Sequence, residues 1–409
     1  MAIDNKDKKV LKSSIEREQN ELACSAEREK IKGSKNLNVP PLRFPEFTEE
    51  WKAEQLDNIA TLSKGIGISK EQLSEDGEPC ILYGELYTKY KSEIIKQVES
   101  KTDINGSKLK RSKANDVIIP CSGETAVDIA TARCVPFDNI LFGGDLNVIS
   151  LHQYDGAFMS YQLNGKRKYD IARVAQGVSI VHLYGEHLKA IKTYNPTLPE
   201  QQKIAKLLSL LDDRIDTQNK IIEKLQSLIK GLRVCCMQRV YGNNVYLSEI
   251  AQIYQPQTIS STELTEDGFL VYGANGIIGK YKDYNHETEQ ICITCRGNTC
   301  GMVNYTKPMS WITGNAMVIN TDKYQDKVCK RYLYHYLSAY NFNSIISGSG
   351  QPQIVRTPLE KLKITLPTIS EQKQKAIIFD KIQDKIDINH KVLNLYIGQK
   401  QYLLRQMFI

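Results

Sequence analysis

The feature that most constrains this chain is an internal repeat, in which residues of one half recur in the other at a constant offset of 171 positions. Matched positions near the end of each half are Pro196 with Pro367, Glu200 with Glu371, and Ile215 with Ile386. Upstream the offset changes, as insertions between homologous domains would make it. At 409 residues the chain is too long for one ordinary core. The repeat therefore predicts two similar globular domains, each followed by one long helix.

The end of each half carries the clearest periodicity in the sequence. Apolar residues step by four and three from Ile204 to Cys236, and the pattern recurs from Phe379 to Met407. Lys375 and Lys400 are polar exceptions in the second run. Such steps are the heptad seam of a coiled coil, so we expect the two long helices to pair.

Capping boxes mark the start of both helices. Thr197-x-x-Glu200 precedes the first and Thr368-x-x-Glu371 precedes the second. In this pattern the threonine and glutamate side chains bind free backbone donors of the first turn, so each helix is predicted to begin there.

One uncharged polar residue interrupts each seam near its centre, Gln218 in the first and Asn389 in the second. If the helices pack antiparallel their midpoints meet, and we predict a hydrogen bond between these side chains that fixes the register. Alternatively, both face a partner or solvent. A helix of about 38 residues spans about 57 Å at roughly 1.5 Å per residue. Domains at its two ends would reach DNA sites one or more turns apart, at about 34 Å per turn.

The globular domains combine strand-like segments such as NVISL and ICITC with short helical segments such as KRYLYHYLSAY, which predicts an α+β fold. An N-terminal arm rich in Lys and Glu precedes them and is expected to be a solvated helix or a flexible segment. The predicted boundaries of the arm, first domain, first helix, second domain and second helix are 1–37, 38–197, 198–240, 241–367 and 368–409.

Composition narrows the class of protein. The formal net charge of +7 mildly favours a nucleic-acid partner. No apolar run approaches the roughly 20 residues of a membrane span, and no signal peptide is evident, so we expect a cytoplasmic protein without a membrane association. Ten cysteines in such a chain predict reduced, mostly buried thiols. Cys292-x-x-Cys295 fits a buried strand better than a zinc site, because no second ligand pair follows at the right spacing.

Sequence motifs for catalysis are missing. Neither NVPPL nor Asn195-Pro196-Thr197-Leu198 supplies the Asn/Asp-Pro-Pro-aromatic loop that grips a flipped adenine, and no glycine-rich loop suits S-adenosylmethionine. GANGIIGKY differs from a phosphate loop in its glycine spacing and in Tyr281, which stands where Ser or Thr would bind magnesium. The six scattered histidines suggest no triad or metal cluster. We therefore expect no enzyme, metal or cofactor site in this chain.

Several separated segments together resemble one family. They are NVPPLRFPEF followed by Trp51, then LPEQQKIAKLLSLLDDRID, VYGANGIIGKY, WITGNAMVI, and SGSGQPQI followed by LEKLKI. In this order, over residues 38–409, they resemble the specificity subunits of type I restriction-modification systems. The charged N-terminal arm departs from the family pattern.

The resemblance implies two target-recognition domains that flank an antiparallel coiled coil. It also implies a bipartite double-stranded DNA target, with one short half-site per domain and an unspecified spacer. The partners would be two modification (methyltransferase) subunits, joined by restriction subunits when DNA is cleaved. S-adenosylmethionine, ATP and magnesium would then belong to those partners.

Side chains that read bases or bind phosphates are mainly Arg, Lys, Asn, Gln, Ser and Thr on loops that approach DNA closely. In the second domain the candidates among glycines are Tyr272, Asn275, Arg296, Asn298, Gln351 and Gln353. The matching region of the first domain supplies Gln176, Ser179 and His182. Further candidates there are Lys64, Lys89, Tyr90, Lys91, Ser122 and Arg133. Alternatives are a local ion pair for Arg296, a plain turn for the glycines and solvated surface charge for the lysines.

Two other functions compete with sequence-specific DNA recognition. One is a coiled-coil scaffold, or degenerate specificity subunit, whose domains do not bind DNA. The other is a fused methyltransferase or nuclease, which the missing motifs disfavour. Apolar residues outside the seam either form a docking face for partner subunits or are buried in the coiled coil: Leu207, Ile221, Leu228, Ile378 and Val392.

Overall fold

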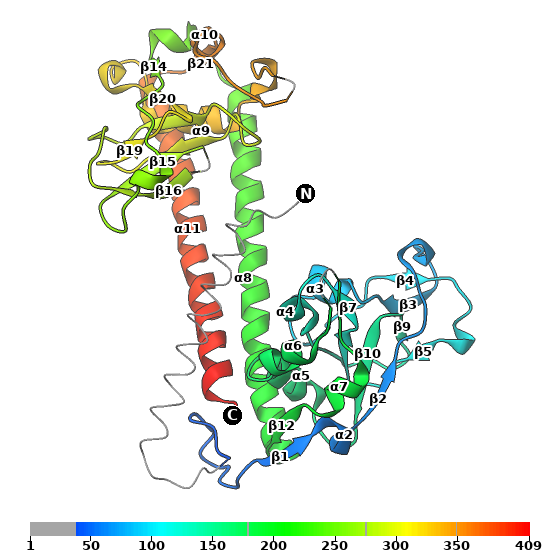
Figure 1. Ribbon diagram of the computed structural model, residues 1–409. Coiled ribbons are helices and arrows are strands. Elements are labelled where there is room, and N and C mark those ends of the chain that lie inside the picture. Colours follow the sequence, from blue (N-terminus) through cyan, green and yellow to red (C-terminus); the bar gives the residue numbers. More distant parts are fainter. Residues whose placement is uncertain (1–37, 178–179, 275, 349) are drawn as a thin grey trace. The chain divides into compact units, whose positions relative to one another are not determined.

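The computed structural model describes residues 38–177, 180–274, 276–348 and 350–409 (Figure 1). These residues divide into two compact units. Unit 1 comprises the described residues up to Asp213 together with Ile397–Ile409, and unit 2 comprises Arg214–Tyr396. The N-terminal arm, for which we predict a charged helix or flexible segment, lies outside the described residues.

The globular part of unit 1 is built on two four-stranded sheets. One is antiparallel, in the order β2 (Ala60–Lys64), β10 (Leu146–Leu151), β6 (Asp116–Pro120) and β8 (Arg133–Val135). The other has the order β4 (Lys101–Thr102), β3 (Glu78–Ile81), β9 (Leu141–Phe142) and β5 (Lys110–Arg111), with β3 and β9 parallel. Two ribbons complete it, β1 (Lys52–Gln55) with β12 (Lys192–Asn195) and β7 (Ser122–Gly123) with β11 (Val181–His182).

Unit 2 repeats this plan. Its antiparallel sheet has the order β14 (Gln252–Tyr254), β20 (Ala316–Asn320), β17 (Ile291–Thr294) and β18 (Val303–Tyr305). Its second sheet has the order β16 (Gly276–Tyr281), β15 (Phe269–Gly273) and β19 (Trp311–Ile312), again with one parallel pair. The ribbon of β13 (Asn243–Tyr246) and β21 (Lys363–Leu366) matches β1 with β12.

Short helices cover these sheets. Unit 1 contains α2 (Leu56–Ile59), α3 (Glu85–Thr88), α4 (Ala126–Ile129), α5 (Gly156–Asn164), α6 (Lys168–Val174) and α7 (Gly185–Lys189). Unit 2 contains α9 (Lys330–Ala339) and α10 (Arg356–Glu360). The main core of unit 2 packs β17 and β20 against the buried face of α9, where Leu333 and Leu337 are fully buried. Burial of such leucines contributes about 1.5–3 kcal/mol each relative to exposure.

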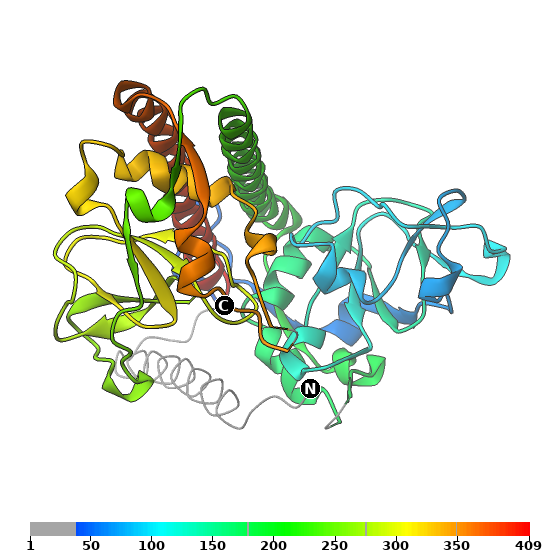
Figure 2. The same cartoon turned by 90° about the horizontal axis from the view of Figure 1, so that it is seen from above.

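The two long helices, α8 (Leu198–Gln238) and α11 (Ile369–Gln406), run side by side in both views (Figures 1 and 2). In unit 1, Ile204 and Leu208 near the start of α8 share a core cluster with Met407 just beyond α11. In unit 2, Ile229 late in α8 packs with Phe379 early in α11. In each unit, therefore, the start of one long helix packs against the end of the other. The predicted α+β fold, with a long helix after each domain and an antiparallel coiled coil, is confirmed.

The start of α8 differs from the capping-box prediction. Both carboxylate oxygens of Glu200 accept hydrogen bonds from Arg43 at 2.7 Å, and one also accepts from Trp51 Nε1 at 3.3 Å. Glu200 is therefore buried beneath the N-terminal segment rather than bound to the first turn. At α11 the predicted box is present, because Glu371 accepts from the backbone N–H of Thr368 at 3.2 Å and Thr368 Oγ1 accepts from Glu371 N–H at 3.4 Å.

The cysteines of the predicted buried strand are buried, as expected. Cys292 lies inside β17, where burial raises the pKa of its thiol to about 12, and Cys295 follows the strand and is also buried. Within the described ranges, no group of three or more His, Cys, Asp and Glu side chains could hold a metal ion. None of the described helices is both long and apolar enough to cross a membrane.

Candidate nucleic-acid interface

In unit 2 two loops that are distant in sequence are joined edge to edge. Arg296 and Gln353 form an isolated antiparallel bridge, Gly297 donates its N–H to Pro352 O at 3.0 Å, and Ile354 donates to Cys295 O at 3.0 Å. We call residues 295–298 with the described residues 347–348 and 350–355 the loop pair of unit 2. It brings together four sequence candidates: Arg296, Asn298, Gln351 and Gln353.

Unit 1 holds an equivalent loop pair, formed by residues 121–124 and the described residues 176–177 and 180–184. Ribbon β7–β11 pairs Ser122 with His182 and Gly123 with Val181, and Leu183 donates its N–H to Cys121 O at 2.7 Å. Positions 181 and 182 are 171 residues from Pro352 and Gln353, so the structural match follows the sequence repeat. Three candidates lie here: Gln176, Ser122 and His182.

In both units the residue before a glycine is bridged to a residue six positions later. Gln176 and His182 exchange backbone hydrogen bonds of 2.8 and 2.6 Å, and Ser347 and Gln353 exchange two of 2.8 Å.

The following glycines require their residue type, because Gly177 has φ +122° and Gly348 has φ +94°. A Cβ atom at Gly177 would lie 2.1 Å from Ile180 O, and one at Gly348 would lie 2.4 Å from Gln351 O. A larger residue would be both strained and obstructed at either position.

The loop pairs present different side chains to solvent. In unit 2, Arg296, Asn298, Gln351 and Gln353 are all exposed. None of these four side chains makes a hydrogen bond or ion pair with another residue in the described part of the chain.

In unit 1 the exposed side chains of the loop pair include two stacked aromatic rings. His182 stacks on Tyr184 with ring centroids 6.1 Å apart, and Lys64 Nζ lies 5.8 Å from the centroid of the Tyr184 ring. Ser122 is buried and donates to Asp145 Oδ2 at 3.1 Å. Lys64, Ser122 and His182, which come from three separate segments, are therefore neighbours through Tyr184 and ribbon β7–β11.

Other candidates of the first domain have contacts that stabilise the fold. Arg133 is buried and donates to the carbonyls of Tyr90 and Ala132, and burial lowers the pKa of its guanidinium. Burial raises the pKa of Tyr90. Lys89 binds the side chains of Glu85 and Ser100, both at 2.6 Å, and Lys91 is exposed.

Tyr272 is also buried, and its hydroxyl accepts a hydrogen bond from Lys307 N–H at 3.2 Å. Burial is the main cause that raises its pKa. Asn275 and Ser179 lie outside the described residues.

Sequence reasoning missed three residues of the unit 1 loop pair: Glu124, Ile180 and Tyr184. All three are exposed. The offset of 171 places Ile180 opposite Gln351 in the repeat, and that match was the signal that could have identified it.

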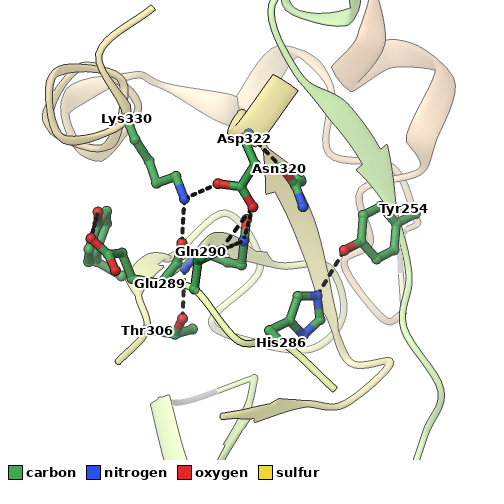
Figure 3. A network of polar contacts seen from close by, with 10 residues as sticks. Tyr254, His286, Glu289, Gln290, Thr306, Asn320, Asp322 and Lys330 are labelled. Carbon is green, nitrogen blue, oxygen red and sulfur yellow. Dashed lines mark hydrogen bonds and ion pairs between the residues drawn. The ribbon is translucent and has the colours of Figure 1, made fainter. Parts of the chain in front are cut away.

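A polar network fastens the sheet of unit 2 (Figure 3). Lys330 at the start of α9 binds Asp322 at 2.5 Å and Glu289 O at 2.6 Å, and Gln290 donates to Asp322 at 2.8 Å. Burial raises the pKa of Asp322, but these hydrogen bonds outweigh it and lower the pKa overall. His286 meets Tyr254 Oη at 2.8 Å, and burial lowers the pKa of its ring. The network joins the segment before β17 to β14, β20 and α9, which is a structural role.

The family model that matches this chain is that of the type I restriction modification DNA specificity domain, over residues 48–227 and 243–395. The EcoprrI specificity subunit of a type I restriction enzyme from Escherichia coli is 31% identical over 147 residues, which are 35% of this chain and 36% of that protein. The MjaVIII specificity subunit from Methanocaldococcus jannaschii is 25% identical over 412 residues, with 86% of this chain and 89% of that protein covered. The chain thus spans about a third of the first relative and most of the second.

Two solved structures share the fold. The crystal structure of the type I restriction-modification system S subunit from M. genitalium matches with a TM-score of 0.66 and 18% identity, and covers 91% of this chain and 99% of that one. A structure from work on complex assembly and conformational transition of the type I R-M system matches with a TM-score of 0.53 and 15% identity, covering 90% and 99%. The family resemblance of the sequence motifs is confirmed, as is the expectation of a non-catalytic subunit. With more than half of its residues matched by the family model, the chain belongs to the type I restriction modification DNA specificity family, and it is a specificity subunit.

Proposed function

We propose that each unit reads one half of a two-part double-stranded DNA target through its loop pair, and that the chain directs partner subunits to this target. The observation that carries the proposal is the repeat of one loop architecture in both units, with a glycine of positive φ at the matched position of each. In unit 2 this architecture exposes one guanidinium and three carboxamides that make no other described contact. These are the groups that hydrogen-bond to base edges in the major groove.

Lys64 in unit 1 and Arg296 in unit 2 place a positive charge at each loop pair. We expect phosphate contacts from partner subunits to add to the affinity. Binding should fall with salt, with a slope set by the number of phosphates neutralised.

The partners we propose are two methyltransferase subunits, joined by restriction subunits for cleavage. S-adenosylmethionine, ATP and magnesium would bind to those subunits. The exposed apolar residues along the helix segments of unit 2 support a docking face: Ile221, Leu228, Ile378, Ile388 and Leu395. Leu395 is 72% exposed, which is unusual for a leucine without a partner. Leu228→Lys should weaken copurification of the methyltransferase, whereas Lys224→Arg, a conservative change on the same helix, should not.

The test is to co-express the chain with the methyltransferase subunit of its system and to map methylated adenines across the host DNA by single-molecule sequencing. We expect a two-part motif with a fixed gap, which is lost when the chain is omitted. Exchange of one unit's globular domain should alter one half of the motif only. A complex that is assembled and active but shows no chain-dependent motif would favour the scaffold function.

A further inference from the structure

The equivalent loop pairs place unlike side chains at matched backbone positions. Gln353 in unit 2 corresponds to His182 in unit 1, and Gln351 corresponds to Ile180, at the offset of 171. On the facing loop Arg296 corresponds to Ser122, because each bridges the matched residue, and Asn298 corresponds to Glu124. The two loop pairs therefore share a backbone arrangement but differ in the side chains that would contact DNA.

The unit 2 set has the chemistry of purine edges. A guanidinium donates two parallel hydrogen bonds that fit guanine O6 and N7, and a carboxamide both donates and accepts, which fits adenine N6 and N7. Arg296, Gln351 and Gln353 are exposed, and none of their side chains hydrogen-bonds to another residue within the described ranges. The isolated bridge between Arg296 and Gln353 holds the guanidinium-bearing and carboxamide-bearing residues side by side on two loops.

The unit 1 set has the chemistry of pyrimidine edges. Glu124 is exposed and only accepts hydrogen bonds, which fits the N4 amino group of cytosine. Ile180 is 60% exposed and can contact only an apolar group, which in the major groove is the methyl of thymine. Ser122 is buried and bound to Asp145, so no donor comparable to Arg296 stands at its position.

We infer that the two loop pairs read opposite edges of base pairs: unit 2 contacts guanine through Arg296 and adenine through Gln351 or Gln353, and unit 1 contacts cytosine through Glu124 and thymine through Ile180. This inference rests on the proposed function, because it takes the loop pairs to contact DNA. It adds which base each side chain selects.

Single substitutions test the assignments in the co-expressed complex by methylation mapping. Arg296→Ala should relax one G·C position, and Gln353→Ala one A·T position, both in the same half-site. Glu124→Ala should relax a C·G position in the other half-site. Each relaxed position should lose discrimination by roughly ten- to a hundredfold, the range for one specific base contact. Lys101→Ala, at an exposed residue that is neither in the loop pairs nor among the candidate DNA-binding residues, is the matched control and should leave the motif unchanged.

The outcomes distinguish a failure of the proposed function from a failure of the base assignment alone. If the native chain gives no chain-dependent two-part motif, the proposed function fails and the inference fails with it. If the native motif is present and the variants leave it unchanged, or Arg296→Ala relaxes an A·T position, only the base assignment is overturned. A variant that does not assemble is replaced by Arg296→Met, Gln353→Glu or Glu124→Gln, which keep a similar side-chain length. These must alter the same positions for the inference to stand.

Discussion

Lys400 in unit 1 and Ile229 in unit 2 occupy matched seam positions, 171 residues apart, in very different surroundings. Lys400 Nζ lies 2.6 Å from both Glu93 Oε2 and Asp212 Oδ1, and all three side chains are largely buried. Asp212 also accepts from Tyr161 Oη at 2.7 Å. Ile229 instead packs in an apolar cluster with Phe379 and Ile386.

Unit 2 has its own polar group between the globular part and the helices, centred on a histidine. His335 on α9 is buried, and its Nδ1 accepts from Arg233 Nη2 at 2.8 Å while its Nε2 donates to Asp380 at 2.8 Å. Both ring nitrogens are satisfied by a neutral ring, whose assigned tautomer carries its proton on Nε2. Arg331 completes the group through an ion pair with Asp380 at 2.8 Å.

The comparison shows that one backbone plan tolerates different chemistry where the domain meets the helices. Unit 1 uses charges that must be matched, and unit 2 uses an apolar seam and a histidine that must stay neutral. The two should therefore respond differently to substitution and to pH. The chain has one tryptophan in each unit, Trp51 and Trp311, so each unit's unfolding can be followed in a variant that lacks the other tryptophan.

The largest contrast is expected from replacing the matched seam residues by methionine. Lys400→Met leaves Asp212 and Glu93 buried without their cation and should lower the unfolding free energy of unit 1 by about 3–5 kcal/mol. Ile229→Met changes only apolar shape and should cost unit 2 about 1 kcal/mol. Denaturant unfolding followed by the tryptophan of each unit measures both. Equal costs would show that the ion pairs of unit 1 are not a buried set.

A second contrast uses one substitution at repeat positions 171 apart. Glu200→Gln removes the charge that binds Arg43 at two points, and should destabilise unit 1 by about 2–4 kcal/mol. Glu371→Gln, at an exposed capping residue, should leave the stability of unit 2 nearly unchanged. The same unfolding experiment applies. A large loss from Glu371→Gln would mean that the cap matters more than the buried ion pair.

Glu200 also shows where sequence reasoning reaches its limit. The heptad seam, the capping box at Glu371 and the α+β class were predictable, because each depends on residues within a few turns or on a local period. The carboxylate of Glu200 is taken by Arg43, which is 157 residues away, and no local pattern signals that contact.

The candidate site likewise contains residues that the sequence could identify and residues that it could not. The neighbouring glycines make Arg296 and Gln353 candidates in the sequence, and the structure joins their two loops by an isolated antiparallel bridge. Arg133 and Tyr272 belong to the right residue types, but they are buried by packing that depends on distant segments. Ile180 is not predictable as a DNA contact from its type, because an apolar residue does not resemble one until its matched position in the other unit is known.

Lowering the pH should reduce the stability of unit 2 more than that of unit 1, and this effect should be smaller than those of the substitutions. Burial lowers the pKa of His335 and of His286, so below about pH 6.5 the unfolded chain binds protons that folded unit 2 resists, and stability is lost as pH falls. Each histidine can contribute at most about 2 kcal/mol between pH 7 and 5.

In unit 1 burial raises the pKa of Asp212, so proton uptake there favours the folded state as pH falls, the opposite sign. Asp380 and Asp322 have lowered pKa values and lose their contribution only below about pH 4, outside this window.

Thermal unfolding from pH 7 to 5 should therefore lower the Tm of unit 2 more than that of unit 1. His335→Gln keeps an acceptor for Arg233 and a donor for Asp380 without titrating, and it should remove about half of the acid sensitivity. Parallel losses in both units would contradict the assignment to the two histidines.

The smallest effect is expected at the centre of the seam, where each half of the repeat has one uncharged polar residue. Gln218 Nε2 donates to Asn389 Oδ1 at 2.5 Å and to Asn389 O at 3.1 Å, which is the contact predicted from the two seam interruptions. The register role of this pair stays a prediction. Asn389→Ala removes one acceptor and leaves the backbone carbonyl, so it should cost about 1 kcal/mol.

Because Gln218 and Asn389 are equivalent positions of the repeat, exchanging them should recreate the same pair. Gln218→Asn alone shortens the donor and should weaken the contact, whereas the double variant Gln218→Asn with Asn389→Gln should recover it. The measurement is a double-mutant cycle on the unfolding free energy of unit 2, in which coupling marks a direct interaction. Additive losses would show that the centre of the seam is as particular to each half as its ends, and that the two helices are not interchangeable even at their midpoint.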